Sequence, residues 1–226
     1  MAAPVIAFDL DGTLVETAPD LIGTLNWVLT QNGYSAMDHA TARPTIGHGA
    51  RAMIEQSLDL QKVSADKADI DRMHASFLTY YADHIADESH PFPGLHAALD
   101  GLTDRGCTLA VCTNKGERLS RMLLDHLDLS KRFAAICGAD TFSRRKPDPV
   151  HLFGTIEQSS GVPTRAVMVG DSITDIKTAK NADVPVVAVD FGYTNVPVSE
   201  LDPDAVISHY DELVPAIEKI APHLFA

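Results

Sequence analysis

Two aspartates near the start of the chain have the types and spacing needed for phosphoryl transfer. The segment Asp9-Leu10-Asp11-Gly12-Thr13 directly follows the apolar run 5–8. Asp9 is therefore expected at the carboxyl end of a strand, where open α/β sheets bind ligands. One carboxylate can attack phosphorus while the other handles a proton. Taken alone, the pattern is more typical of a turn in which aspartates cap backbone amides.

Two further apolar runs are followed by groups that suit a phosphate. Thr113 and Asn114 follow the run 108–112, and their hydroxyl and amide groups can hold phosphate oxygens at the start of a helix. Lys146 lies in a loop after the run 134–137, where its charge can neutralise a phosphoryl group and an attacking carboxylate. The structural alternatives are an ordinary helix cap and a solvated basic loop.

A fourth apolar run, 166–169, ends in acids that suit a metal ion. Asp171 lies at a strand end, as Asp9 does, and Asp175 comes one helical turn later. Hard divalent cations prefer oxygen ligands, so Asp9 and Asp171 are predicted to hold Mg²⁺ between neighbouring strands. A helix cap with an acidic first turn would explain Asp171 and Asp175 separately. Four strand ends that all carry a phosphate or metal group favour the chemical interpretation.

The elements that position these residues predict an α/β fold. Apolar runs at 5–8, 108–112, 134–137, 166–169 and 186–189 alternate with helical patterns, which indicates a parallel sheet covered on both faces. A weaker strand is expected at 205–207. The stretch 15–91 has only helical periodicity, for example Leu21, Leu25, Val28 and Leu29. We expect residues 1–14 and 92–226 to form the α/β core and residues 15–91 an inserted, all-helical cap.

Composition excludes several classes of partner. The 226 residues carry 18 Lys and Arg against 31 Asp and Glu, a net charge of -13, which argues against nucleic acid or an anionic membrane. The three cysteines have neither disulfide nor zinc spacing, and no run is long and apolar enough for a membrane span. We expect a reduced, cytoplasmic protein that acts on a small phosphorylated metabolite, as a monomer or a homodimer.

The whole constellation resembles the haloacid dehalogenase superfamily. The motifs are DLDGT at 9–13, Thr113, Lys146 and GDSITD at 170–175, in that order. The stretch FDLDGTLVETAPDL and the segment Thr45-Ile46-Gly47-His48-Gly49-Ala50 resemble the phosphoglycolate phosphatases of that superfamily. The resemblance implies a Rossmann-like sheet with strand order 5-4-1-2-3, where the strands are counted along the core.

The resemblance also implies a role for each matching residue. Asp9 would be the nucleophile and a magnesium ligand. Asp11 would be the general acid/base and would offer its backbone carbonyl to the metal. Thr113 and Lys146 would bind phosphate, Asp171 would be a metal ligand, and Asp175 would support the ligands from behind. The product would form through an aspartyl-phosphate intermediate.

The inserted segment is predicted to select the substrate. The free amides that follow Gly47, His48 and Gly49 suit a carboxylate, and Arg51 adds charge within one helical turn. With Asn114 these residues form the predicted substrate-binding set, and 2-phosphoglycolate is the favoured substrate. The sequence departs from the family pattern at Glu16-Thr17, where Asp-Ser is usual, and at His48, where Asn is frequent.

Other functions stay open at this point. A sugar-phosphate mutase or phosphatase and an inorganic pyrophosphatase need the same acids, whereas dehalogenases lack the acid at the position of Asp11. A phosphate-sensing receiver-like domain shares the fold class but is disfavoured by the long insert. A catalytically silent binding module is disfavoured by the complete set of charged groups.

Overall fold

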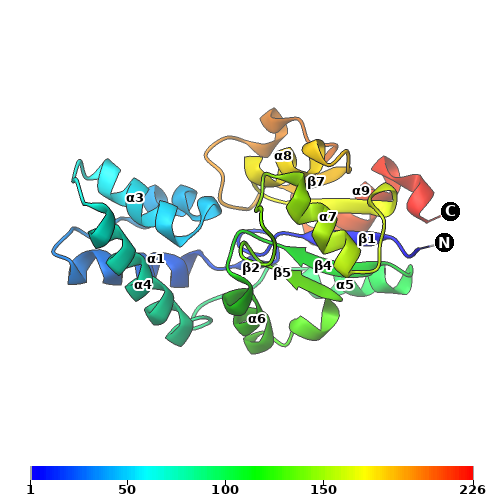
Figure 1. Cartoon of the computed structure of the whole chain (residues 1–226). Helices are drawn as coiled ribbons and strands as arrows, with labels where there is room; N and C mark the ends of the chain where they lie inside the picture. The colour runs from blue at the N-terminus through cyan, green and yellow to red at the C-terminus, as the bar shows by residue number, and fades with distance from the viewer. Residues whose placement is uncertain (1, 226) are drawn as a thin grey trace.

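Six parallel strands form the central sheet, in a computed structural model that describes residues 2–225 apart from the side chain of His48. The strands lie in the order β5-β4-β1-β6-β7-β8 (Figure 1). Their carboxyl ends meet at one edge of the sheet because they are parallel. Their bounds are β1 (Val5–Phe8), β4 (Thr108–Cys112), β5 (Ala135–Cys137), β6 (Ala166–Gly170), β7 (Val186–Val189) and β8 (Ala205–Ile207).

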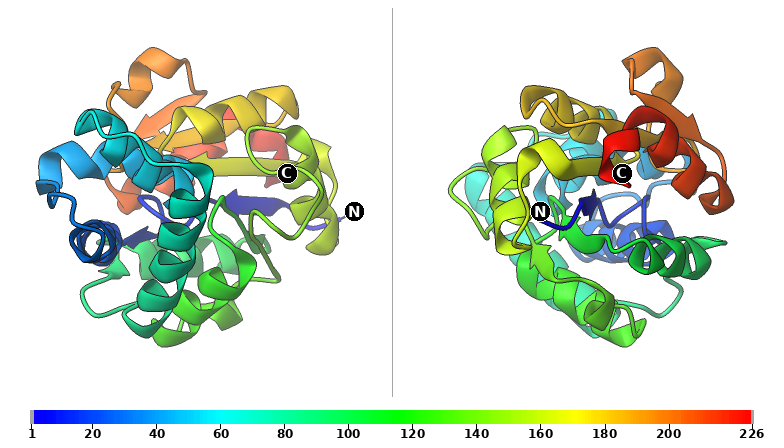
Figure 2. Two further views of the ribbon diagram at one scale, coloured as in Figure 1. Left: turned by 60° about the vertical axis from the view of Figure 1, so that its left-hand side comes forward. Right: turned by 90° about the vertical axis from the view of Figure 1, so that its right-hand side faces the viewer.

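Helices cover both faces of this sheet, as its nearly continuous apolar strands require. The helices α5 (Leu95–Asp104), α6 (Glu117–His126) and α9 (Leu213–Ile220) cover one face (Figure 2). The other face is covered by α7 (Pro149–Gln158) and α8 (Ile173–Asn181). Along β1, Ile6 and Phe8 face the first layer, and Val5 and Ala7 face the second. The core therefore has two apolar layers, with β1 at its centre.

A helical segment is inserted between β1 and β4. It leaves and rejoins the core through two short antiparallel strands, β2 (Val15–Glu16) and β3 (His90–Pro91). Its helices form one end of the molecule in Figure 1, where α1 and α3 both pack against α4. Their bounds are α1 (Ala18–Gln31), α2 (His39–Ala42), the 3-10 helix η1 (Arg43–His48), α3 (Ala50–Leu60) and α4 (Lys67–Asp83).

The predicted fold class is confirmed. The five core strands lie in the expected order, and the sheet differs only by the addition of β8 (Ala205–Ile207) beside β7 at the edge. The expectation of an insert without strands is wrong at its two ends. There Val15 pairs with Pro91 and Glu16 with His90, because the two chain crossings run side by side and can satisfy each other's backbone groups.

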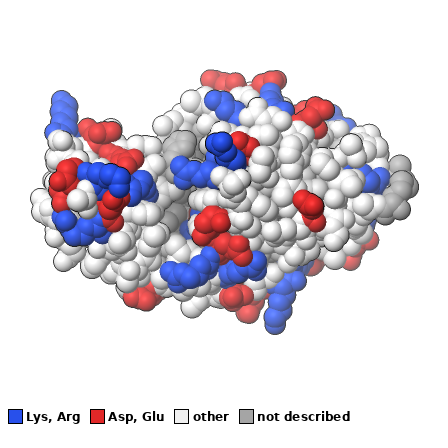
Figure 3. Space-filling view, in the orientation of Figure 1, with Lys and Arg blue, Asp and Glu red and all other residues white. Residues whose placement is uncertain are grey.

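The charged side chains and the cysteines can be placed on the structure. On the face seen in Figure 3, Lys and Arg side chains are interspersed with Asp and Glu and do not form one broad basic patch. Cys107, Cys112 and Cys137 are free and buried. Among the described residues, the helices include none with the length and apolar character needed to cross a membrane.

A buried carboxylate ties the two ends of the insert together. Asp20, in the first turn of α1, is only 7% exposed. It accepts hydrogen bonds from the backbone N–H groups of Glu88 and Ser89 and from the Ser89 hydroxyl, at 2.6 to 3.2 Å. The segment that returns to the core is thereby held against the helix that leaves it.

We expect Asp20→Ala to lower the free energy of unfolding by about 2–3 kcal/mol, because two N–H donors at this partly buried site lose a charged acceptor. Urea denaturation monitored by circular dichroism measures the change. The matched control is Asp87→Ala, which removes an exposed carboxylate in the same segment and is expected to cost less than about 0.5 kcal/mol. Equal losses in the two variants would contradict a special role for Asp20.

Candidate active site

Three carboxylates converge at the carboxyl edge of the sheet. Asp9 follows β1, Asp171 follows β6, and Asp175 lies in the first turn of α8. One oxygen from each lies within 4.8 Å of the others. Asp171 and Asp175 are buried, and the Asp9 side chain is 14% exposed. The sequence prediction that Asp9 and Asp171 lie side by side is thus matched by the geometry.

One buried lysine compensates part of this negative charge. Lys146 lies 2.5 Å from Asp175 and 3.0 Å from Asp9, measured from its ammonium to a carboxylate oxygen. Burial works against its charged form, but the carboxylates of Asp175 and Asp9 raise the pKa of Lys146. It therefore stays charged throughout the ordinary pH range.

The remaining negative charge is not compensated by an ion pair. Burial, with a smaller contribution from the Asp175 carboxylate, raises the pKa of Asp9 to about 6. Burial, followed by repulsion from Asp175 and Asp9, also raises the pKa of Asp171 well above its usual value. Among the described residues no cation pairs with Asp171, which accepts hydrogen bonds from Thr13 at 3.1 Å and from the Tyr193 N–H at 2.7 Å. A bound cation would relieve this strain.

Glycines let the backbone approach the acids closely. A Cβ atom added to Gly192 would lie 2.2 Å from the Cβ of Asp171, and one added to Gly170 would lie 2.3 Å from the Cβ of Asp175. Gly12 has a φ of +81°, and its added Cβ would lie 2.6 Å from an Asp171 oxygen. The two buried acids are therefore packed against backbone on several sides and have little room to move.

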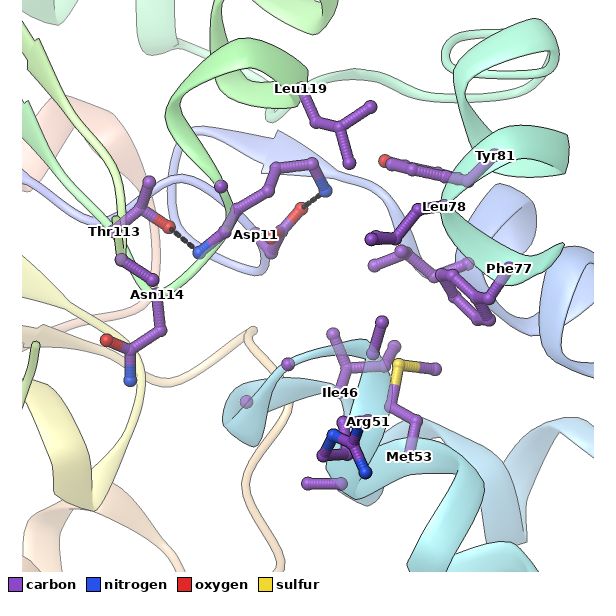
Figure 4. Close-up of a pocket in the computed structure, with 18 of the residues that line it drawn as sticks. Asp11, Ile46, Arg51, Met53, Phe77, Leu78, Tyr81, Thr113, Asn114 and Leu119 are labelled. Carbon is purple, nitrogen blue, oxygen red and sulfur yellow. Dashed lines mark hydrogen bonds and ion pairs between the residues drawn. The ribbon is translucent and has the colours of Figure 1, made fainter. Parts of the chain in front are cut away.

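Asp11 lies beside the cluster and is held by two donors. Its carboxylate accepts a hydrogen bond from the Thr17 hydroxyl at 2.8 Å and forms an ion pair with Lys115 at 2.8 Å. A dashed line ends at this carboxylate in Figure 4. Asp11 and Asp9 both face the cavity described below, so the two carboxylates can reach one substrate.

Thr113 and Asn114 lie between β4 and α6, as predicted. The Thr113 hydroxyl is nearly inaccessible and accepts a hydrogen bond from the Lys115 N–H at 3.2 Å. The Asn114 side chain donates to the backbone carbonyl of Lys146 at 3.2 Å, so it holds the loop that carries this lysine. Both residues line the cavity in Figure 4, and their contact with a substrate stays a prediction.

A cavity of about 490 Å³ separates the carboxyl edge of the sheet from the insert. The core side supplies charged and polar groups, including Asp9 and Asp11. The insert side is largely apolar and is shown by labelled side chains in Figure 4. These apolar residues are Leu21, Ile46, Met53, Phe77, Leu78 and Tyr81.

Three of the predicted substrate-binding residues of the insert line this cavity, and the charge of one of them, Arg51, is already paired. Gly47 and Gly49 line it, and Gly49, with a φ of +88°, precedes the first residue of α3. Arg51 lines it too, but its guanidinium is paired with Asp71 and, at 3.6 Å, with Glu55. The side chain of His48 lies outside the described part of the structure.

Three residues near the site were not predicted from the sequence. Lys115 pairs with Asp11 inside the cavity. Tyr193, after β7, binds Asp171 through its N–H and donates its hydroxyl to Glu16 at 2.7 Å, which connects the acids to the start of the insert. His151 of α7 accepts a hydrogen bond from the Lys146 N–H at 3.2 Å. Only Lys115 carried a signal, because it follows Thr113-Asn114 at a strand end.

Comparison with known proteins defines the class. The family model described as haloacid dehalogenase-like hydrolase matches residues 6–189. The chain belongs to this family of hydrolases. Membership in a family of enzymes, together with the insert between β1 and β4, tells against the receiver-domain alternative.

Curated relatives and solved structures cover almost the whole chain. A phosphoglycolate phosphatase from Mesorhizobium japonicum is 51% identical over 94% of this chain and 94% of that protein. One from Agrobacterium fabrum is 46% identical over 95% of this chain and 92% of that protein. A crystal structure described as a predicted phosphoglycolate phosphatase from Haemophilus somnus has a TM-score of 0.88 at 25% identity, covering 94% of this chain and 97% of that one.

The raised pKa of Asp9 gives a prediction for the metal-free protein. Asp9 binds its proton more tightly in the folded protein, at a pKa of about 6, than in the unfolded chain, where the ordinary value is 3.8. The folded protein therefore loses stability as the pH rises through this range. We expect Asp9→Asn to raise the free energy of unfolding by about 1–3 kcal/mol at about pH 7.5, in excess chelator.

Urea denaturation of both proteins across pH measures this difference. The two curves should converge below about pH 4, where Asp9 is protonated in both states. Asp104→Asn, which removes an exposed acid at the end of α5, is the control and should not follow this pH dependence. An Asp9→Asn protein less stable than the wild type at neutral pH would rule out a strained Asp9 carboxylate.

Proposed function

We propose that this chain is a magnesium-dependent phosphatase that hydrolyses 2-phosphoglycolate to glycolate and phosphate through an aspartyl-phosphate on Asp9. The observation that carries the proposal is the convergence of Asp9, Asp171 and Asp175, two of them paired with Lys146, beside Asp11 and next to a cavity of about 490 Å³. The names of the curated relatives support the choice of substrate.

The acid cluster fits a hard divalent cation. It offers carboxylate oxygens from separate elements, and Lys146 is the only ammonium that pairs with it among the described residues. We assign Asp9, Asp171 and the backbone carbonyl of Asp11 as ligands, while Asp175, engaged by Lys146 and Ser172, supports them. Bound Mg²⁺ would offset the repulsion between the attacking carboxylate and the phosphoryl group.

The chain's own residues divide the reaction between them. A carboxylate oxygen of Asp9 forms a bond to phosphorus while the bond from phosphorus to the glycolate oxygen breaks, and Asp11, which must enter this step protonated, gives its proton to that oxygen. In the second half, Asp11 takes a proton from water, the water oxygen bonds to phosphorus, and the Asp9–phosphorus bond breaks. Lys146 and Thr113 hold the phosphoryl oxygens and stabilise the charge that develops on them.

The insert supplies the cover that such chemistry needs. We propose residues 15–91 as a cap domain on a core of residues 1–14 and 92–226, with hinges at the β2–β3 pair and at 92–94. A cover excludes water from the phosphoenzyme and strengthens the electrostatic interactions within. We further propose that the protein works in the cytoplasm.

A substrate panel tests the proposed activity. We expect the purified enzyme with Mg²⁺ to show a kcat/KM for 2-phosphoglycolate at least about tenfold above that for glucose 6-phosphate or pyrophosphate, because a small cavity selects a small leaving group. Excess chelator should abolish the activity and added Mg²⁺ should restore it. A preference for a sugar phosphate or for pyrophosphate would contradict the proposed substrate. Full activity in excess chelator would exclude the metal-dependent mechanism.

Two substitutions test the residue roles. Asp9→Asn should reduce kcat more than about 100-fold, because an amide oxygen is a poor nucleophile. Asp11→Asn should slow hydrolysis of 2-phosphoglycolate much more than that of nitrophenyl phosphate, whose leaving group needs no proton. Steady-state kinetics on both substrates measures the contrast. Equal losses on the two substrates in Asp11→Asn would argue against an acid role.

A further inference from the structure

A buried cation connects the proposed acid to the insert. Lys115 follows Thr113-Asn114 in the loop before α6, and its side chain is 6% exposed. Its ammonium lies 2.8 Å from the Asp11 carboxylate and 4.4 Å from the centre of the Tyr81 ring of α4. Burial opposes its charge, but the neighbouring Asp11 raises the pKa of Lys115, so the cation persists. A positive charge thus lies inside the cavity, between core and insert.

The other cations that line the cavity in the described chain are less suited to bind an anion there. Arg118 and Arg145 are exposed to solvent. The Arg51 guanidinium is compensated by Asp71 and Glu55 and is 41% exposed. Lys146 is not among the residues that line this cavity; it is buried in the acid cluster and held by Asp9 and Asp175. Lys115 is the cation that a leaving group beside Asp11 would meet.

The chemical structure of the proposed substrate requires a proton donor and a cation close to each other. In 2-phosphoglycolate a single methylene separates the ester oxygen, which needs a proton, from the carboxylate, which needs a cation. The residue that protonates the first and the residue that binds the second must therefore be neighbours. Asp11 and Lys115 are such a pair, in direct contact at 2.8 Å.

We propose that Lys115 is the specificity-determining residue of this site. When the substrate binds, the Lys115 ammonium exchanges its ion pair with Asp11 for one with the substrate carboxylate. This inference rests on the proposed phosphoglycolate phosphatase function. A neutral leaving group offers Lys115 no such partner, so the discrimination comes from charge. Tyr81 holds the ammonium by a cation–π contact and makes its position depend on the insert.

The test compares two substrates that differ in this one group. They are 2-phosphoglycolate and 2-hydroxyethyl phosphate, in which a neutral alcohol replaces the carboxylate. We expect Lys115→Met to reduce kcat/KM for 2-phosphoglycolate about 10- to 100-fold more than for 2-hydroxyethyl phosphate, the loss of one charged hydrogen bond. Lys115→Arg should recover part of the selectivity. Lys219→Met, on the exposed face of α9, is the control and should behave as the wild type.

A second variant leaves Lys115 and Asp11 intact. Tyr81→Leu should reduce the selectivity about two- to tenfold, because the ammonium loses its aromatic partner. Equal losses of Lys115→Met on both substrates, or no loss on either, would overturn the specificity role. If the wild type hydrolyses both substrates equally well, the proposed substrate fails and the inference fails with it. If the wild type prefers 2-phosphoglycolate and Lys115→Met keeps that preference, only the inference fails.

Discussion

At the carboxyl edge of the sheet, three carboxylates are held close together with too little positive charge to compensate them. Asp9, Asp171 and Asp175 lie together, and one ammonium, that of Lys146, pairs with Asp9 and Asp175 but not with Asp171. Such an arrangement is unfavourable in a low dielectric unless the geometry is imposed from outside. The surrounding chain imposes it: glycines bring the backbone against Asp171 and Asp175, and the capping box of α8 fixes Asp175 through Ser172. The sheet supplies the rigidity, and the acids keep an unsatisfied affinity for a cation.

The same acids are connected to the insert through Tyr193. Its N–H binds Asp171, while its hydroxyl accepts hydrogen bonds from the N–H groups of Thr17 and Ala18 and donates one to Glu16. Arg43, from the insert, lies over the Tyr193 ring at 4.8 Å and pairs with Glu16 at 2.9 Å. One residue therefore contacts the acid cluster through its backbone and the start of the insert through its side chain.

Most of the sheet and its edge could be predicted because the signals are local. An apolar run followed directly by Asp9, and another followed by Gly170 and Asp171, place both acids at strand ends, and parallel pairing then brings them together. The order of the strands came from the resemblance and not from periodicity. Tyr193 could not be found in this way, since its partner Glu16 lies 177 positions away and its own loop has no motif. The pairing of Arg51 with Asp71 was equally hidden, because it depends on how α3 packs against α4.

Local charge, not net charge, decides which ligand this acidic chain can bind. The net charge of -13 is distributed over the surface, where solvent and salt screen it within about 10 Å. Lys146 and Lys115 lie in buried surroundings, where the same charge acts more strongly. Each already holds an aspartate, so neither adds an uncompensated charge in the absence of a ligand. In the proposed reaction, a substrate that carries two anionic groups meets both lysines, and the paired aspartates act on its phosphorus and its ester oxygen.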